Sequence, residues 1–254
     1  MAFITFISDM GYRDHYVASM KGMIYSIHPS CMIIDIAHKV EAFNLSQAAY
    51  TIRSTYKNFP KGTIHLIAVG TSSMNSIRFI IAKIDSHYFV APDNGILSLI
   101  IDKDPELVIE LEKKEEDTFP EKNILAKAAA QLALGEDISK LGNKITTIEK
   151  KLFRQPRQTE NQLIGAVIYI DEYGNLITNI EYALFEKLKQ NKKFQLKIGR
   201  ETIHSIHTYY NQVEPGDCIA LFNSNHLLEI AIYKGNAMQL LGIQFDHPIT
   251  ISFY

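Results

Sequence analysis

The sequence predicts an α/β N-terminal domain with a mostly parallel sheet, residues 1–150, and a smaller all-β, barrel-like C-terminal domain, residues 164–254. Three observations support this prediction. Strand and helix patterns alternate in the first half, which is typical of βαβ units. A polar segment, residues 151–163, follows and is typical of a linker. Short strand patterns separated by turn residues then fill the rest of the chain, as in small barrels or sandwiches.

A βαβ unit opens the chain. Residues 2–8 are apolar and β-prone, and this strand ends at Asp9. Apolar residues then recur at helical spacing over residues 16–27, and His28-Pro29 ends the helix. Residues 32–36 give a second buried strand. A strand, a helix and a strand in this order predict a parallel pair of strands.

The remaining elements of the first half follow from similar signals. A helix begins near Asn44, runs to Ile52 and ends before Phe59-Pro60. Further strands are expected over residues 63–69 and 108–111, a hairpin over 79–85 and 88–91, and helices over 96–101 and 124–134. The last of these helices is rich in Ala and stops at Gly135, a residue type that often ends helices.

The second half has a different texture. Its apolar stretches are short, and turn residues separate them. The expected strands are residues 164–170, 176–180, 194–198, 218–222, 228–231 and 249–253.

Composition excludes several classes of protein. The chain has 254 residues and a net charge of -2, so no basic surface for nucleic acid is expected. No apolar run approaches the ~20 residues that cross a bilayer, and the N-terminus lacks a basic region of a signal peptide. Cys31 and Cys218 are expected to be two buried thiols. We therefore expect a cytoplasmic protein without nucleic-acid or membrane partners.

Neither a metal site nor a dinucleotide site is predicted. The His residues are scattered, and the pair His204 and His207 lacks a third ligand. The first strand is not followed by the G-x-G-x-x-G pattern of dinucleotide-binding folds. We expect no cofactor and no metal.

The end of the first strand is the first candidate binding site. Ser8-Asp9-Met10-Gly11 and Asp14 follow this strand, and ligands of open parallel sheets bind beyond the carboxyl ends of strands. The two oxygens of an Asp can accept both hydroxyls of a ribose. Asp9 could equally be an N-cap that starts the following helix.

Two loops of the second half form further candidates. Asp171 to Asn179 places a carboxylate and two amides in one loop, which suits an amine and a purine edge. A plain hairpin around Gly174-Asn175 is the alternative. Ser224, within Phe222 to His226, could receive a carboxylate together with backbone N–H groups, or simply lie in a turn.

These segments occur in one order with others across the chain. The set comprises Ser8-Asp9 with Asp14, Met20 to Pro29, Ile34 to His38, Phe59 to Thr63, Ala91 to Gly95, Asp171 to Asn179 and Leu228 to Ala231. Together they resemble the S-adenosylmethionine hydroxide adenosyltransferases, or hydrolases, whose relatives are the fluorinase and the chlorinase. The resemblance spans nearly the whole chain.

The resemblance implies an α/β domain followed by a β-barrel, usually in a homotrimer that binds its ligand between the N-terminal domain of one subunit and the C-terminal domain of a neighbour. S-adenosylmethionine (SAM) would be the substrate. By this resemblance Asp9 binds ribose and Phe43 forms a pocket wall. Asp171 holds the methionine amine, and Ser224 receives the methionine carboxylate. Asn225, next to Ser224, is a further ligand-binding candidate. Asn175, Tyr209, Tyr233 and Lys234 would face adenine.

The residues that activate water in this family are missing here. The positions of its Asp, Arg and His fall on Gly70, Ile77 and Pro120. Glu121, Ser73 and Arg78 are candidate catalytic substitutes, with Glu121 as a general base. We expect hydrolysis of SAM to adenosine and L-methionine by nucleophilic attack at C5′. The alternatives are a non-catalytic SAM or adenosine-binding homologue, or an enzyme that uses another nucleophile or adenosyl compound.

Overall fold

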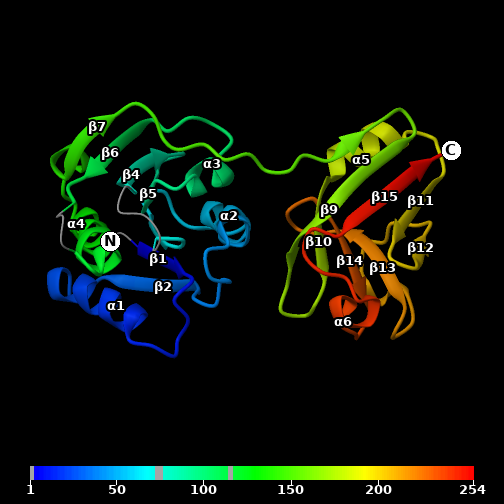
Figure 1. The fold of residues 1–254 in the computed structure, drawn as a ribbon, viewed down its shortest axis with the longest axis horizontal. Helices are drawn as coiled ribbons and strands as arrows, with labels where there is room; N and C mark the ends of the chain where they lie inside the picture. Colours follow the sequence, from blue (N-terminus) through cyan, green and yellow to red (C-terminus); the bar gives the residue numbers. More distant parts are fainter. Residues whose placement is uncertain (1–2, 72–76, 114–116) are drawn as a thin grey trace. The chain divides into compact units, whose positions relative to one another are not determined.

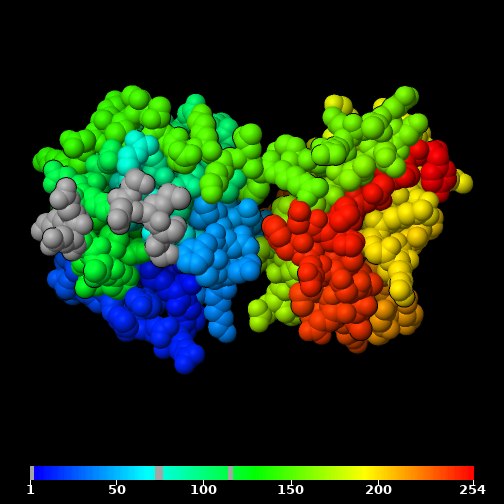
Figure 2. All heavy atoms as spheres, in the orientation of Figure 1, coloured from blue at the N-terminus to red at the C-terminus, as the bar shows by residue number. Residues whose placement is uncertain are grey.

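The computed structural model describes residues 3–71, 77–113 and 117–254. The chain divides into two compact units, Met1–Phe153 and Arg154–Tyr254 (Figure 1). Figure 2 shows one face of each unit with all heavy atoms drawn as spheres. Residues 154–163, part of the expected linker, belong to the second unit, where the short strand β8 (Arg157–Gln158) pairs with β9.

A seven-stranded sheet forms the first unit, in the order β2-β1-β3-β5-β4-β6-β7. Its strands are β1 (Phe3–Ser8), β2 (Met32–Ala37), β3 (Ile64–Ala68), β4 (Phe79–Ile84), β5 (His87–Pro92), β6 (Leu107–Leu111) and β7 (Gly142–Ile145). The sequence predicted all of them except β7, whose residues Gly-Asn-Lys-Ile carry almost no apolar pattern.

The prediction of a mostly parallel sheet is only partly confirmed, because the sheet is mixed. The pairs β1–β2, β1–β3 and β3–β5 are parallel, whereas β4–β5, β4–β6 and β6–β7 are antiparallel. The two-residue turn between β4 and β5 causes the change of direction. Asp85 and Ser86 both have positive φ, as in the tight turns that join antiparallel strands.

Helices cover both faces of this sheet. On one face α1 (Tyr16–Ile27) and α4 (Lys127–Ala133) pack in a core with Phe6 and Leu66. On the other face α2 (Leu45–Arg53) and α3 (Ile96–Ile100) pack in a second core with Ile7 and Ile67. The remaining helical segments are η1 (Tyr56–Asn58), the π-helix η2 (Glu121–Ala126) and η3 (Ile138–Lys140). The sheet therefore lies between two layers of helices.

The second unit is an eight-stranded antiparallel sheet in the order β12-β11-β15-β9-β10-β14-β13, with β8 alongside β9. Its longer strands are β9 (Gln162–Ile170), β10 (Leu176–Glu181), β11 (Phe194–Ile198), β12 (Glu201–Ile203), β13 (Cys218–Phe222), β14 (Leu227–Ile232) and β15 (Pro248–Phe253). His207, which follows β12, forms a bridge with Leu221 on β13, so the two ends of the sheet approach each other and give a nearly closed barrel. The barrel-like prediction is confirmed in this form.

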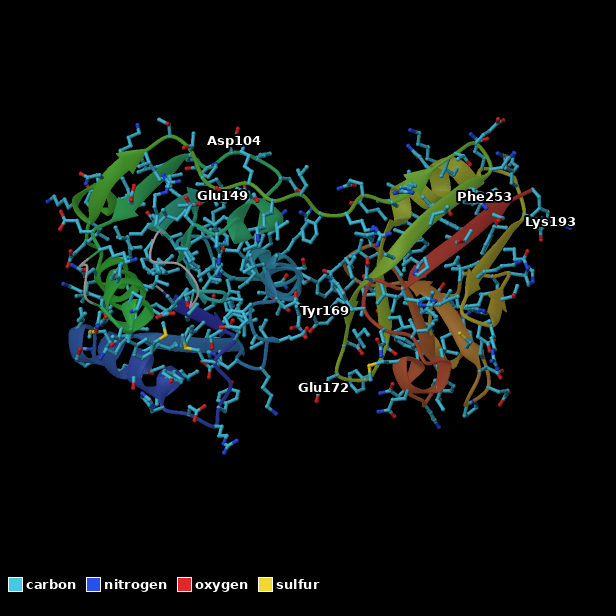
Figure 3. All side chains as sticks on the ribbon, viewed as in Figure 1. Asp104, Glu149, Tyr169, Glu172, Lys193 and Phe253 are labelled. Atoms are coloured by element: carbon cyan, nitrogen blue, oxygen red, sulfur yellow. The ribbon has the colours of Figure 1, made fainter. Side chains whose placement is uncertain are left out.

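The prediction that this unit is all-β is wrong. It also contains α5 (Tyr182–Lys189), η4 (Tyr210–Gln212) and α6 (Ala237–Leu241). Leu184, Phe185 and Leu188 of α5 recur at helical spacing and pack against the barrel core. The short helix escaped prediction because strands surround it. Tyr169 lies near the end of β9, and Glu172 lies in the turn between β9 and β10 (Figure 3).

Both cysteines are free thiols: Cys31 is buried, whereas Cys218 is only half-buried, a correction to the expected burial. Among the described residues no helix has the length and apolar character needed to span a membrane. The cytoplasmic location remains a prediction.

Candidate functional site

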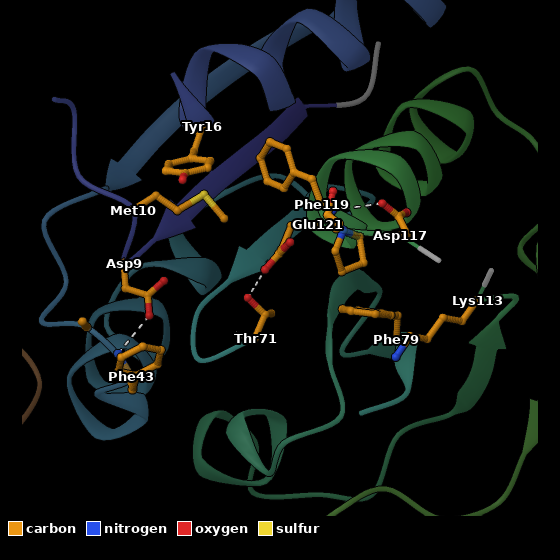
Figure 4. Close-up of a pocket in the computed structure, with 13 residues that line it drawn as sticks. Asp9, Met10, Tyr16, Phe43, Thr71, Phe79, Lys113, Asp117, Phe119 and Glu121 are labelled. Atoms are coloured by element: carbon orange, nitrogen blue, oxygen red, sulfur yellow. Dashed lines mark hydrogen bonds between the residues drawn. The ribbon is translucent and has the colours of Figure 1, made fainter. Parts of the chain in front are cut away.

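A cavity of about 800 Å³ lies in the first unit beside the carboxyl end of β1 (Figure 4). Polar and apolar groups share its lining, which consists of Asp9, Met10, Tyr16, Ala42, Phe43, Thr71, Phe79, Lys113, Asp117, Thr118, Phe119, Pro120 and Glu121. Three residues predicted from the sequence, Asp9, Phe43 and Glu121, are therefore brought together around one cavity.

Asp9 is held rigidly at the mouth of this cavity. Its Oδ2 accepts hydrogen bonds from the backbone N–H groups of Phe43 (2.9 Å) and Gly70 (3.1 Å). Among the described residues Oδ1 has no protein partner. One oxygen thus fixes the two flanking loops, and the other remains available to a ligand hydroxyl.

Phe43 completes this side of the cavity. Its φ is 65°, an uncommon value for a residue with a bulky side chain, and the residue is 59 % exposed. The adjacent Asn44 caps α2 by accepting the N–H of Gln47 at 3.0 Å. The cap and Asp9 together hold Phe43 in this strained conformation, and strain of this kind clusters at ligand sites.

A network of polar side chains around the buried residues Ser8 and His38 lies next to Asp9. The hydroxyl of Ser8 lies 2.7 Å from His38 Nδ1, and His38 Nε2 lies 3.1 Å from Asp35 Oδ1, outside hydrogen-bond geometry. Asp35 also accepts the Lys21 ammonium at 2.7 Å. Burial lowers the pKa of His38, although Asp35 opposes this shift. His38, which follows β2, therefore links the end of β1 to Asp35 on β2.

Glu121 stands on another wall of the cavity, at the start of η2. It is only 8 % exposed, and the hydroxyl of Thr71 donates a hydrogen bond to its Oε1 (Figure 4). A π-helix is rare and often marks a functional site. The pair brings together two residues that are far apart in the sequence, one after β3 and one opening η2.

The rings of Tyr16, Phe79 and Phe119 form part of the remaining lining of the cavity. The rings of Tyr16 and Phe119 meet edge to face, with centroids 5.5 Å apart, beside Met10. Asp117 secures this wall by accepting the N–H of Phe119 at 3.0 Å and the amide of Asn123 at 2.8 Å. The cavity thus offers the carboxylates of Asp9, Asp117 and Glu121 together with aromatic rings, which suits an organic cation, and Lys113 is the cationic side chain in its lining.

The second unit contains a cavity of about 670 Å³. Its lining comprises Asp171, Tyr173, Asn175, Tyr210, Ile232, Tyr233, Lys234, Gly235 and Asn236. Four residues predicted to bind ligand, Asp171, Asn175, Tyr233 and Lys234, are therefore gathered here.

The turn between β9 and β10 shapes this cavity. Asp171 Oδ1 accepts the N–H of Asn175 at 2.8 Å, and its Oδ2 accepts the Asn175 amide at 2.9 Å. Gly174 has a φ of 82°, and a Cβ there would lie 2.2 Å from the Asn236 side chain. Only glycine allows the turn to pack this closely against the loop that forms the other wall.

Several predicted site residues line neither cavity. Arg78 is paired with the carboxylate of Asp93 and also donates to Thr147 O at 3.4 Å. Asp14, Tyr209, Ser224 and Asn225 are exposed. Ser73 lies outside the described residues.

Other residues enter the site that the sequence did not predict. Thr71, Phe119 and Tyr210 line the cavities, and Glu229 bonds to one of them. Phe119 stands in the segment that resembles the family's water site, so its neighbours gave a usable signal. Glu229 stands in Leu228 to Ala231, one of the segments that carry the resemblance, but no role was predicted for it. Thr71 and Tyr210 gave no signal, because their partners Glu121 and Glu229 are distant in the sequence.

In the described part of the chain, no group of three or more His, Cys, Asp or Glu side chains is arranged to hold a metal ion.

Comparisons with known proteins agree with the two-unit division. The sequence profile of the SAM hydroxide adenosyltransferase N-terminal domain matches residues 4–142, and that of the C-terminal domain matches residues 165–250. An (R)-S-adenosyl-L-methionine hydrolase of Thermus thermophilus is 27 % identical over 98 % of both chains. A fluorinase of Actinopolyspora mzabensis is 25 % identical, over 90 % of this chain and 89 % of its own.

Solved structures extend the similarity to the fold. An uncharacterized conserved protein from Thermotoga maritima has a TM-score of 0.89 and 31 % identity, over 98 % of this chain and 100 % of its own. A conserved hypothetical protein from Thermus thermophilus has a TM-score of 0.79 and 27 % identity, with full coverage of both chains. The matched profiles span most of the sequence, and the chain belongs to the SAM hydroxide adenosyltransferase family.

Proposed function

We propose that this protein hydrolyses SAM to adenosine and L-methionine. One observation supports this most directly: a single cavity contains Asp9, with one carboxylate oxygen available, and the Thr71–Glu121 pair. Relatives named (R)-S-adenosyl-L-methionine hydrolase match the chain over nearly its whole length. The first feature suits a ribose, and the second suits a water molecule.

The proposed ligand contacts divide between the two units, at the two cavities and at exposed residues outside them. Asp9 binds the ribose hydroxyls, and Phe43 forms a wall beside them. In the second unit Asp171 binds the methionine amine, and Asn175 reads the adenine edge together with the backbone near Tyr233 and Lys234. Ser224 and Asn225 receive the methionine carboxylate, and the exposed ring of Tyr209 stacks on adenine. The exposed side chain of Asp14 contributes at the periphery of the ribose site.

Glu121 is the general base in this proposal. A water molecule attacks C5′ of the ribose, a C5′–O bond forms, and the C5′–S bond breaks with its electron pair moving to sulfur. Methionine leaves as a neutral thioether, so no acid is needed. The proton of the attacking water passes to Glu121 and then to solvent. Thr71 holds the carboxylate toward the cavity and leaves its second oxygen for the water.

Water is a better nucleophile for this site than a halide. Glu121 occupies the position where the halogenating relatives carry a hydroxyl, according to the resemblance. An ionised carboxylate there repels an anion and attracts the hydrogens of water. Arg78 has no part in the proposed water site, because its guanidinium is committed to Asp93. By the resemblance, Ser73 falls where the fluorinase carries a hydroxyl, and it stays a candidate catalytic residue.

A homotrimer completes the site in this proposal. The ligand contacts fall on two separate units, and the family resemblance joins the N-terminal unit of one subunit to the C-terminal unit of a neighbour. SAM is the substrate, and no cofactor takes part. Light scattering coupled to gel filtration tests the assembly: a trimer mass supports it, and a stable monomer contradicts it.

Chromatography of purified protein incubated with SAM tests the reaction. Adenosine and methionine should form in equal amounts above a control without protein. Glu121→Gln should reduce the rate at least 100-fold, consistent with the loss of a general base, and leave SAM affinity nearly unchanged. Glu136→Gln, an exposed residue of the same unit, is the matched control. Tight binding of SAM that stays intact would instead indicate a binding homologue.

A further inference from the structure

A buried carboxylate in the second unit is not used by the proposed chemistry. Glu229 lies on β14, between Leu221 of β13 and Ile177 of β10. Its neighbours Leu228 and Ile230 belong to the barrel core, so Glu229 faces the opposite side of the sheet. It is nevertheless only 4 % exposed. Burying a carboxylate costs free energy unless hydrogen bonds or a paired charge compensate for the lost water.

Glu229 bonds with both oxygens to two different structures. The hydroxyl of Tyr210 donates to its Oε1 at 2.6 Å, and the Asn223 amide donates to its Oε2 at 3.2 Å. Burial raises the pKa of Glu229, the two donors lower it, and the negative charge of Asp171 raises it further. Tyr210 lines the cavity that contains Asp171 and Asn175. One carboxylate therefore connects a cavity wall with the β13–β14 turn.

Asn223 transmits this connection to the turn. Its Oδ1 accepts the backbone N–H groups of Asn225 (3.0 Å) and Leu227 (3.3 Å). Because an amide has its oxygen and its nitrogen on opposite sides, the bond from Nδ2 to Glu229 sets which atom faces the turn. The turn contains Ser224, whose exposed hydroxyl is proposed to receive the methionine carboxylate.

We infer that Glu229 is a positioning residue that orients Asn223, and through it the Ser224–Asn225 turn, for recognition of the amino-acid carboxylate of the substrate. This inference rests on the proposed function. Glu229 touches no substrate atom in it. Its role is to hold the amide so that the turn keeps one conformation, and it ties that turn to the Tyr210 wall.

A comparison of SAM with decarboxylated SAM tests the inference, because the second compound lacks the group that the turn recognises. The measured quantity is kcat/KM for SAM divided by kcat/KM for decarboxylated SAM. The corresponding ratio of binding affinities, from calorimetry, is a second readout. Glu229→Gln should lower this ratio about tenfold, mainly through KM, since a glutamine cannot accept from both donors. Glu214→Gln, exposed in the same unit, is the control and should leave the ratio unchanged.

Two further variants separate positioning from general support of the fold. Asn223→Ala removes the link to the turn and keeps the Tyr210–Glu229 bond, so it should lower the ratio as Glu229→Gln does, even if Glu229→Gln fails to fold. Tyr210→Phe keeps the bond between Asn223 and Glu229. It should weaken the binding of SAM and of decarboxylated SAM by the same factor and leave the ratio unchanged. An unchanged ratio in folded Glu229→Gln or Asn223→Ala overturns the inference.

The wild-type protein distinguishes this failure from failure of the proposed function. If it binds SAM without releasing adenosine, hydrolysis is refuted and the ratio of dissociation constants still tests Glu229. If it binds neither compound, both the proposed function and the role of Glu229 are overturned.

Discussion

The carboxylate of Asp9 accepts the backbone N–H of Phe43 at 2.9 Å, across 34 residues of sequence. The same oxygen accepts the N–H of Gly70, so three loops that follow β1, β2 and β3 meet at one atom. The bond explains how a bulky residue can keep a φ of 65° at the rim of the cavity. Asp9 therefore has two roles in the proposed site: it shapes the rim and binds the ribose.

Asp9→Asn should weaken the binding of adenosine by about 10- to 100-fold. The amide can still accept one backbone N–H through its oxygen, but it loses the charge, and hydrogen bonds to charged groups contribute roughly 1.5–3 kcal/mol. Calorimetric titration with adenosine measures the change. Asp104→Asn is the matched control, because Asp104 is exposed and forms only a 3.6 Å contact with Lys150 (Figure 3). Equal affinities for the two variants would contradict a ribose site at Asp9.

Gly70→Asp should destabilise the protein and should not restore the family's water-activating group. The φ of Gly70 is 70°, and a Cβ there would lie 2.9 Å from Leu45 Cδ2 and 3.2 Å from Asn94 Nδ2. Strained backbone and overpacking of this kind cost about 1–3 kcal/mol. Denaturant unfolding followed by circular dichroism measures the loss.

The control for this substitution is Gly22→Ala, in the middle of α1 with no atom within 4 Å of the new Cβ. It should stabilise the protein by about 0.5–1 kcal/mol, because Ala is the better helix former. If Gly70→Asp folds as stably as the wild type and speeds adenosine release, the loop can accept the missing carboxylate, and the explanation given for Gly70 fails.

Local patterns predicted most of the fold. The apolar spacing of α1, the Asn44 cap of α2 and the β4–β5 hairpin all depend on neighbours in the sequence, and each is confirmed. The predicted β4–β5 hairpin makes that pair antiparallel, but the prediction did not extend this to β6 and β7, whose antiparallel pairing depends on contacts between segments distant in the sequence. Helix α5 was missed because eight residues of helical spacing lie among strands.

The candidate site divides in the same way. Asp9 and the Asp171–Asn175 turn were predicted, since they follow strands and stand in segments with recognisable residue patterns. Thr71 was not predicted, because its partner Glu121 is 50 residues away and a lone Thr after a strand carries no signal. Arg78 was predicted as catalytic from its position near the family's Arg, but a contact 15 residues away directs its guanidinium to Asp93.

The stability of the protein should fall as the pH decreases below about 6.5, and His65 should account for part of this fall. His65 is buried between Thr5, 2.7 Å from its Nδ1, and His87, 3.2 Å from its Nε2. Burial, with a smaller contribution from His87, lowers the pKa of His65 to about 3. The folded protein keeps this ring neutral over a range in which the unfolded chain binds a proton.

The contribution of neutral His65 to the free energy of unfolding is fully present above pH 6.5. It falls by about 1.4 kcal/mol per pH unit between pH 6.5 and about 3. His65→Gln should therefore make the free energy of unfolding less dependent on pH between 7 and 5, as measured by urea titration at several pH values. His15→Gln, at an exposed position in the same unit, should retain the full dependence. Parallel curves for the two variants would show that His65 titrates normally.

Arg78→Gln should reduce stability and leave catalysis in the folded protein nearly unchanged. The Asp93 side chain is 3 % exposed, and its Oδ1 also accepts the N–H of Glu149 at 2.8 Å. Removing the guanidinium leaves a buried carboxylate without its cation, which costs on the order of 3 kcal/mol or more for a fully buried pair. The cost here should be somewhat lower, because Arg78 itself is 36 % exposed. Thermal unfolding and adenosine release, measured on the same preparation, give the two quantities.

Arg53→Gln is the control, since its pair with Asp102 lies at the surface and should contribute at most about 1 kcal/mol. A folded Arg78→Gln protein with normal SAM affinity and a kcat reduced more than tenfold would return Arg78 to the catalytic site.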